Sequence, residues 1–126
     1  MKARLLISVV DDDQSFREAL PELLNELGFA ARTFSSAKEF LVSDAGLHSS
    51  CLLLDVGMPE MSGPELFREL RRRNVKIPVV FITARRDEAA RSQLLNDGAV
   101  ECLFKPFDET AMLQALNKAI GREKMF

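Results

Sequence analysis

The sequence predicts a single α/β domain in which five strands alternate with five helices around a parallel sheet. Short, mostly apolar runs recur five times along the 126-residue chain, and each is followed by a segment with apolar residues at helical spacing. Strands this apolar are typical of a sheet that helices cover on both faces. A hydrophobic content of 47% allows one sizeable core at this length, so we expect one domain over residues 1–126.

The five predicted strands lie at residues 5–10, 29–34, 51–55, 77–82 and 100–104. Ser8 alone interrupts the first run, which stops at three aspartates. The third run ends on Asp55, and a loop rich in glycine and proline follows at once. A buried strand that ends in this way presents its acid at the edge of the sheet, where open α/β proteins bind their ligands.

The first predicted helix follows the aspartates and ends at Gly28, which can close it in a left-handed conformation. Its buried face carries Phe16, Leu20, Leu23, Leu24 and Leu27. Pro21 lies inside this helix and removes one backbone hydrogen bond. We expect a kink near Arg17 and no helix end there, because the leucine pattern continues past the proline.

The second predicted helix is short. Ser36 with Glu39 three residues later predicts a capping box at its start, and the helix ends near Val42. His48, the only histidine, falls in the polar loop that follows and is expected on the surface.

Start and stop signals also bound the last three helices. The third opens at Gly63 with a proline behind it and ends on three arginines at residues 71–73. The helix dipole favours positive charge there, so we interpret the arginines as a solvated helix end. Asp87 and Gly98 bound the fourth helix, and Asp108 begins the last. The buried faces carry Leu66, Phe67 and Leu70 in the third helix and Leu113, Leu116 and Ile120 in the last, before the unpatterned residues 122–126.

The alternation of strands and helices predicts a doubly wound sandwich with right-handed crossovers. At this length the flavodoxin-like strand order 2-1-3-4-5 is favoured. Strands one and three are then neighbours, which brings Asp11, Asp12 and Asp55 into one crevice at the carboxyl edge of the sheet. Thr83 and Lys105 reach the same edge from strands four and five.

Three carboxylates in one crevice repel one another, and a divalent cation allows such a cluster to remain ionised. An all-oxygen ligand set without histidine or cysteine indicates Mg²⁺, with Mn²⁺ as the alternative. Magnesium shares its ligand shell readily with phosphate oxygens, so we expect the site to bind a phosphoryl group together with the metal. Asp55 is then either another metal ligand or the nucleophile that becomes an acyl phosphate.

Composition excludes several classes of function. The formal net charge of -2 gives no field that would hold nucleic acid or an anionic membrane, so we expect neither partner for this domain. No apolar run is long enough to span a bilayer or to form a signal peptide, and we expect a cytoplasmic protein. Cys51 and Cys102 lack zinc-ligand or redox spacing and are interpreted as buried free thiols.

Four motifs at the predicted strand ends indicate a family. They are VVDDD at residues 9–13, LDVGMPEMSG at 54–63, VFITA at 80–84 and FKPF at 104–107. Together they resemble the receiver domain of bacterial two-component response regulators, over essentially the whole chain. FSSAKEFL at residues 34–41 and KPFD at 105–108 resemble the FixJ-type branch, whose receivers usually precede a LuxR-type helix-turn-helix output domain. Such an output domain would lie outside this chain.

The resemblance implies that Asp55 accepts a phosphoryl group from a cognate histidine kinase. It also implies that Asp12, Asp55 and the backbone carbonyl of Gly57 hold Mg²⁺ directly, with Asp11 acting through water. The protein would then catalyse only its own phosphorylation and dephosphorylation and turn over no metabolite.

For the residues at strands four and five, the resemblance implies a switch. Thr83 would move toward the phosphoryl oxygens, Ala84 would leave room for them, and Lys105 would pair with them. The bond between Lys105 and Pro106 would be cis, as in many functional turns. Phosphorylation would alter the face formed by the fourth helix, the fifth strand and the last helix, and either a homodimer or a released output domain would follow.

Three positions depart from the common pattern or modulate it. Cys102 stands where many receivers carry a Tyr or Phe whose ring turns inward. We therefore expect loop and helix shifts after strand four to carry the change in place of the usual relay from threonine to ring. Gly57, two residues past the acceptor, offers no side chain to shield or assist an attacking water. Arg85, two residues past Thr83, could reach over the phosphoryl group.

Three other readings compete with this one. A phosphohydrolase of the haloacid-dehalogenase kind would need a second aspartate two residues after the nucleophile, where Gly57 stands. A dinucleotide-binding domain would need a glycine-rich turn after the first strand, where three aspartates would repel a pyrophosphate. A phosphorylation-independent interaction module is expected to have lost the acceptor, the acids or the lysine, and all are present. A receiver that acts on its own, without an output domain, stays an open alternative.

Overall fold

The computed structural model describes residues 4–121 and contains one sheet of five parallel strands. The strand order is β2-β1-β3-β4-β5, as the sequence predicted. The strands are β1 (Leu6–Val10), β2 (Ala30–Phe34), β3 (Cys51–Asp55), β4 (Val79–Thr83) and β5 (Glu101–Phe104). β4 begins two residues later than predicted because Pro78 has no N–H to donate to a neighbouring strand.

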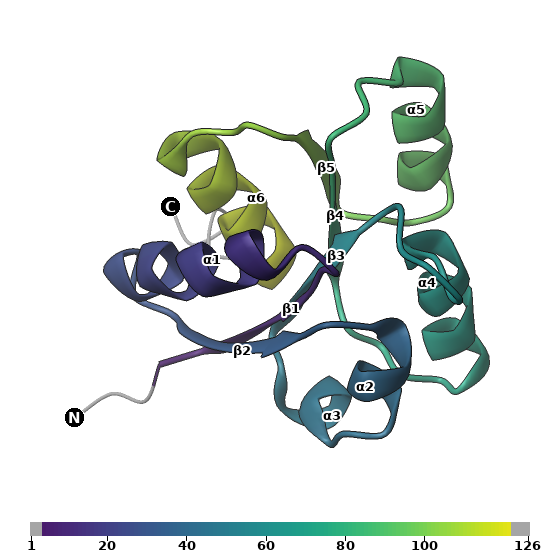
Figure 1. The fold of residues 1–126 in the computed structure, drawn as a ribbon, viewed down its shortest axis with the longest axis horizontal. Helices are drawn as coiled ribbons and strands as arrows, with labels where there is room; N and C mark the ends of the chain where they lie inside the picture. The colour runs from purple at the N-terminus through teal and green to yellow at the C-terminus, as the bar shows by residue number, and fades with distance from the viewer. Residues whose placement is uncertain (1–3, 122–126) are drawn as a thin grey trace.

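Helices cover both faces of the sheet (Figure 1). α1 and α6 lie on one face, and α2 to α5 lie on the other. The bounds are α1 (Gln14–Glu26), α2 (Ala37–Leu41), α3 (Ala45–His48), α4 (Gly63–Arg72), α5 (Glu88–Asn96) and α6 (Glu109–Ile120). Within residues 4–121, none of these helices has the length and apolar character needed to cross a membrane.

The central strand β3 explains why its sequence is continuously apolar. All five of its residues are buried, and successive side chains enter opposite halves of the core. Leu53 packs in the cluster beneath α1 and α6, whereas Leu52 and Leu54 pack in the cluster beneath the other four helices. Because β3 is packed in the core on both faces of the sheet, its last residue, Asp55, is held at a fixed place on the sheet edge.

Local signals bound the helices largely as expected. Asp13, Asp87 and Asp108 each accept backbone N–H groups at the start of α1, α5 and α6. Gly28 and Gly98 adopt positive φ angles of 98° and 109° just after α1 and α5. α1 runs continuously through Pro21, so this proline does not end the helix.

The predicted capping box at Ser36 forms only in part. The Ser36 hydroxyl accepts the Glu39 N–H, but the Glu39 carboxylate accepts from the N–H and hydroxyl of Ser35 instead of the Ser36 N–H. A complete capping box is found at Ser62 and Glu65, where the sequence predicted only a glycine-proline start.

One further prediction about the helices was wrong, and another, in which Leu116 was correctly predicted as buried, was right only in part. His48 does not lie in a loop; it ends α3, a four-residue helix too short to show periodicity, although its side chain is exposed as expected. In α6 the fully packed face consists of Met112, Ala115 and Leu116, while Leu113 and Ile120 are only partly buried. The unpatterned residues 122–126 lie outside the described residues.

Candidate phosphoacceptor site

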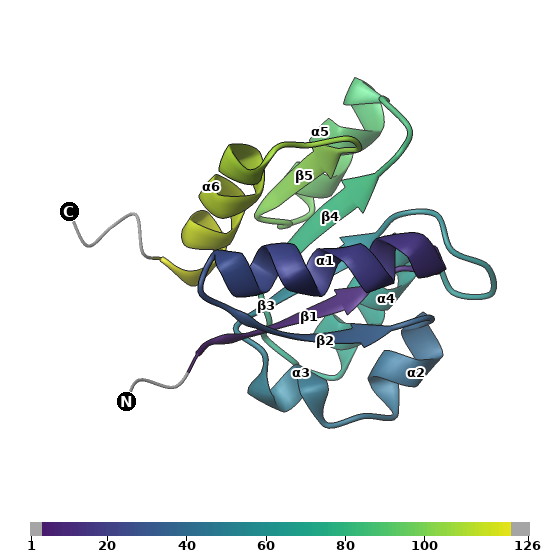
Figure 2. The same cartoon turned by 60° about the vertical axis from the view of Figure 1, so that its left-hand side comes forward.

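The strand ends bring the predicted site residues together. Asp11 follows β1, Asp55 ends β3, Thr83 ends β4 and Lys105 follows β5. The parallel register aligns these ends, since Val10 pairs with Leu54, Asp55 with Ile82 and Thr83 with Phe104. All strand arrows point the same way in Figure 2, so the carboxyl ends of the strands lie along one edge of the sheet.

Three acids form the centre of the site, as the sequence predicted. Asp11, Asp12 and Asp55 each offer a carboxylate oxygen, and these atoms lie within 4.8 Å of one another. Asp11 is completely buried, Asp55 is 8% exposed and Asp12 is exposed. The cluster therefore has a buried floor and one acid open to solvent.

Asp11 is the best-anchored member of this cluster. Its Oδ1 accepts the backbone N–H of Asp13 at 2.8 Å, and its Oδ2 accepts from the Lys105 ammonium at 2.8 Å. Its backbone carbonyl accepts from the Arg17 guanidinium at 2.8 Å. The bonds from Asp13 and Lys105 satisfy both oxygens of this buried carboxylate, which is the condition for keeping a charge buried.

Asp55 has a strongly shifted pKa. Burial, followed by the nearby negative charge of Asp11, raises the pKa of Asp55 to about 7 from the ordinary value of 3.8. Asp12 also raises it, and the positive charge of Lys105 opposes the shift. A perturbed carboxyl at the edge of a parallel sheet is typical of a functional site.

Lys105 lies at the junction of β5 and α6. Its backbone N–H donates to the Thr83 carbonyl at 2.8 Å, and its peptide bond to Pro106 is cis, as the resemblance implied. The side chain is 21% exposed, and its Nζ lies 4.0 Å from the centre of the Phe16 ring. Helical spacing alone predicts only that Phe16 lies on the buried face of α1, and it gives no sign of this contact.

Thr83 is nearly buried, with 9% of its surface exposed. Its Oγ1 accepts the backbone N–H of Arg85 at 3.1 Å, while Ala84 and the Arg85 side chain are exposed. A small cavity of about 90 Å³ extends from Thr83 to Cys102. Thr83 is thus next to open space inside the fold.

The Cys102 position is occupied by a buried thiol whose pKa is raised by burial. The Arg91 guanidinium from α5 donates to the Cys102 carbonyl at 3.1 Å and to the Glu101 carboxylate at 2.6 Å. This pair of contacts fastens α5 to β5. Cys51 is also buried, and burial raises its pKa to about 12, so both cysteines are buried free thiols as predicted.

The loop after Asp55 owes its path to a glycine that the sequence analysis treated only as a helix start. A Cβ at Gly63 would collide with the Asp55 carbonyl oxygen, and the Gly63 N–H donates to the Val56 carbonyl at 2.9 Å. This close approach folds the loop back against Asp55. Gly57 is exposed, and a Cβ added there would meet nothing within 4 Å among the described residues beyond its chain neighbours.

Residues 7–117 match the family model of the response regulator receiver domain. The chain belongs to this family. It is 39% identical over 91% of its length to the transcriptional regulatory protein TdiR of Thauera aromatica, and it covers 51% of that protein. It is 36% identical over 97% of its length to the transcriptional regulatory protein FixJ of Azorhizobium caulinodans, and it covers 58% of that protein. This receiver domain thus spans about half the length of these relatives.

Solved structures agree with this assignment. The crystal structure of FixJ-N is 32% identical to the receiver domain, covers 96% of each chain and superposes with a TM-score of 0.83. The structure of the response regulator StyR is 41% identical, with a TM-score of 0.85 over 98% of this chain and 62% of that one. The FixJ-type resemblance predicted from the sequence is confirmed by these matches.

Proposed function

We propose that this receiver domain takes a phosphoryl group onto Asp55 from a histidine kinase in a reaction that requires Mg²⁺. The observation that carries the proposal is the convergence of three acids opposite Lys105 at one edge of the sheet. The output that it controls is transcriptional, as the names of the relatives suggest, and is supplied by a domain outside residues 1–126.

The residues present fit a magnesium ion. Asp12 and Asp55 offer carboxylate oxygens, the Gly57 backbone offers a carbonyl, and Asp11 acts through water because its own oxygens already accept from Asp13 and Lys105. Hard oxygen ligands of this kind suit Mg²⁺, and Mn²⁺ is the alternative. When bound, the ion would neutralise phosphoryl oxygens and favour the ionised form of Asp55.

Asp55 is the nucleophile in this proposal. One of its carboxylate oxygens forms a bond to phosphorus as the bond from phosphorus to the kinase imidazole nitrogen breaks, and the imidazole leaves with that electron pair. The product is an acyl phosphate. Attack requires the ionised carboxylate, and the pKa of about 7 means that ionisation is incomplete near neutral pH until a cation assists.

Lys105 and Thr83 respond to the new charge. The Lys105 ammonium, now on Asp11, gains a phosphoryl oxygen as a second anionic partner. The Thr83 hydroxyl accepts one N–H and still has its own proton to donate. Ala84 adds little bulk beside it, and in this proposal the exposed Arg85 and Gly57 modulate access to the phosphoryl group.

In this proposal, phosphorylation of Asp55 changes the face formed by α5, β5 and α6. α5 has a single buried residue, Leu94, so we expect it to shift with little loss of core packing. The bonds from Arg91 to the Cys102 carbonyl and the Glu101 carboxylate would link that shift to β5. Phosphorylation would bias this face toward self-association or toward release of the output domain. Only a difference in interaction between the two states can produce that bias.

Intact-mass measurement after incubation with acetyl phosphate and Mg²⁺ tests the function. We expect one added phosphoryl group that is labile to base and to hydroxylamine, as an acyl phosphate is. Asp55→Asn should lose the added mass, and Asp13→Asn, which leaves the three-acid cluster intact, is the matched control. Full phosphorylation of Asp55→Asn would show that the acceptor is another residue.

A further inference from the structure

We propose that Phe16 is a positioning residue for Lys105: its ring holds the ammonium beside Asp11 so that the charge faces the acceptor. The proposal rests on the proposed phosphoryl transfer to Asp55, which it deepens by adding a neutral partner for the lysine. Phe16 itself touches neither the acceptor nor a phosphoryl group in this account.

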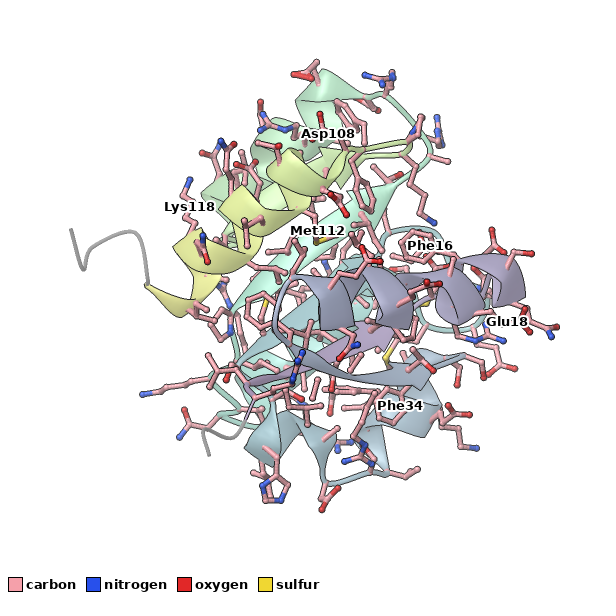
Figure 3. All side chains as sticks on the ribbon, turned by 90° about the vertical axis from the view of Figure 1, so that its left-hand side faces the viewer. Phe16, Glu18, Phe34, Asp108, Met112 and Lys118 are labelled. Atoms are coloured by element: carbon pink, nitrogen blue, oxygen red, sulfur yellow. The ribbon has the colours of Figure 1, made fainter. Side chains whose placement is uncertain are left out.

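The position of Phe16 follows from the cap of α1. The Asp13 carboxylate accepts the Phe16 N–H at 3.3 Å and so fixes the first helical turn directly after the acids. Phe107 meets the Phe16 ring edge to face, with ring centres 6.2 Å apart and planes at 83°. Figure 3 shows Phe16 on the side of α1 that faces α6. The ring is therefore held by the first turn of α1 and by the loop between β5 and α6.

The ring acts on Lys105 by electrostatics. The face of an aromatic ring carries partial negative charge and attracts a cation within about 6 Å of its centre. Lys105 Nζ lies 4.0 Å from the Phe16 ring centre and 2.8 Å from Asp11 Oδ2. Because the lysine side chain is only 21% exposed, water competes weakly with both partners.

The Phe16 ring is a neutral partner for the Lys105 ammonium, and it therefore acts differently from a second carboxylate at that place. A carboxylate beside Lys105 would compete with phosphoryl oxygens for the same positive charge and would add repulsion to the acid cluster. The Phe16 ring restrains the ammonium without adding negative charge. The lysine therefore remains close to the site while its ionic partner changes.

This contact is distinct from the other ring contacts of cations within residues 4–121. Arg71 lies 4.3 Å from the Phe67 ring centre, and Arg32 and Arg86 lie 5.5 Å from the centres of Phe34 and Phe104. In each of those the cation is an arginine outside the proposed phosphoacceptor site. Phe16 is also partly open, because it lines a groove of about 570 Å³ with Leu23 and Pro106, so its ring can be altered without emptying the core.

The first test measures beryllofluoride binding at saturating Mg²⁺, with Mg²⁺ affinity measured separately. We expect Phe16→Leu to bind beryllofluoride about fivefold more weakly, because the loss of a partly desolvated contact between a cation and an aromatic ring lowers affinity by a factor of that order. Its affinity for Mg²⁺ should equal that of the parent. Phe16→Tyr should restore binding. Leu23→Ala, which alters the same groove away from Lys105, is the matched control and should bind normally.

A second series separates electrostatics from shape. Replacing Phe16 with mono-, di- and trifluorinated phenylalanine weakens the negative ring face in steps while nearly preserving volume. Beryllofluoride affinity should fall stepwise along the series. In a Lys105→Met background, Phe16→Leu should cause no further loss. Equal affinity along the fluorinated series, or an undiminished loss in that background, would overturn the proposal.

Proton NMR of Lys105 detects the contact between Lys105 and the Phe16 ring independently of any phosphoryl transfer. A ring 4.0 Å from Nζ should shift the ε-methylene protons upfield, and Phe16→Leu should remove that shift while Leu23→Ala keeps it. A parent protein that shows the shift but binds no beryllofluoride would contradict the proposed function. A parent that binds beryllofluoride no better than Phe16→Leu would contradict only the role of Phe16.

Discussion

Lys105 donates to Asp11 across 94 positions of the chain, with 2.8 Å between Nζ and Oδ2. The pair joins the end of the first strand to the end of the last, and its carboxylate is completely buried. Among residues 4–121, removing the lysine would leave that carboxylate with only the Asp13 N–H as a hydrogen-bond partner.

We therefore expect Lys105→Met to lower the free energy of unfolding by about 3 kcal/mol, the size typical of a buried pair that loses one partner. Asp11→Asn in the same protein should recover part of the loss, because the buried charge is then gone. Urea unfolding of both single variants and the double variant measures this coupling. Strict additivity would show that the two side chains do not act as a pair.

The pKa of Asp55 predicts how stability depends on pH in the absence of divalent cations. Burial, then the charge of Asp11, raises this pKa from 3.8 to about 7, so the folded state binds the proton more tightly than the unfolded chain. The Asp55 contribution is therefore fully favourable below about pH 4 and is lost as the pH rises to about 7.

Asp55→Asn should remove this dependence. We expect the variant to exceed the parent in free energy of unfolding by about 2 kcal/mol near pH 8 and to match it near pH 4, as judged by urea unfolding. Millimolar Mg²⁺ should stabilise the parent and reduce the difference at the higher pH. A difference that is the same at both pH values would mean that Asp55 does not titrate in this range.

Asp12 is expected to be a metal ligand that costs stability when no metal is bound. It adds negative charge to the cluster and contributes to the raised pKa of Asp55. Asp12→Ala should therefore raise the melting temperature of the metal-free protein slightly and weaken Mg²⁺ binding. Thermal melts with and without millimolar Mg²⁺ test both effects. If parent and variant gain equally from Mg²⁺, Asp12 is not a ligand.

The switch should work without an aromatic ring at position 102. Cys102 has no ring to rotate, whereas Thr83 and Lys105 are joined at the root of the α5, β5 and α6 face by the bond between their backbones. We expect Cys102→Ala to keep the response to beryllofluoride, and Thr83→Ala or Lys105→Ala to blunt it without preventing phosphorylation. Sedimentation of each variant with and without beryllofluoride measures the response. Loss of response in Cys102→Ala alone would contradict the prediction.

The sequence by itself determined the order of strands and the edge on which the site forms. The buried run that ends on Asp55 and the helix caps at Asp13, Asp87 and Asp108 are signals within a few residues of one another. Such signals can be recognised in a single sequence because apolar periodicity and helix capping depend on local backbone geometry. Parallel topology then places strand ends together without any knowledge of distances.

Only the tertiary structure decided how the site is held. The Phe16 ring over Lys105, the Gly63 backbone against the Asp55 carbonyl and the Arg91 bonds to β5 join segments that no local pattern relates. No local pattern predicts α3 either, because a four-residue helix is too short to show periodicity. The burial of Met112 was not predicted because the spacing of the leucines in α6 indicated a different buried face. These contacts depend on side-chain directions and on the packing of helices against the sheet, and those are set by the whole fold at once.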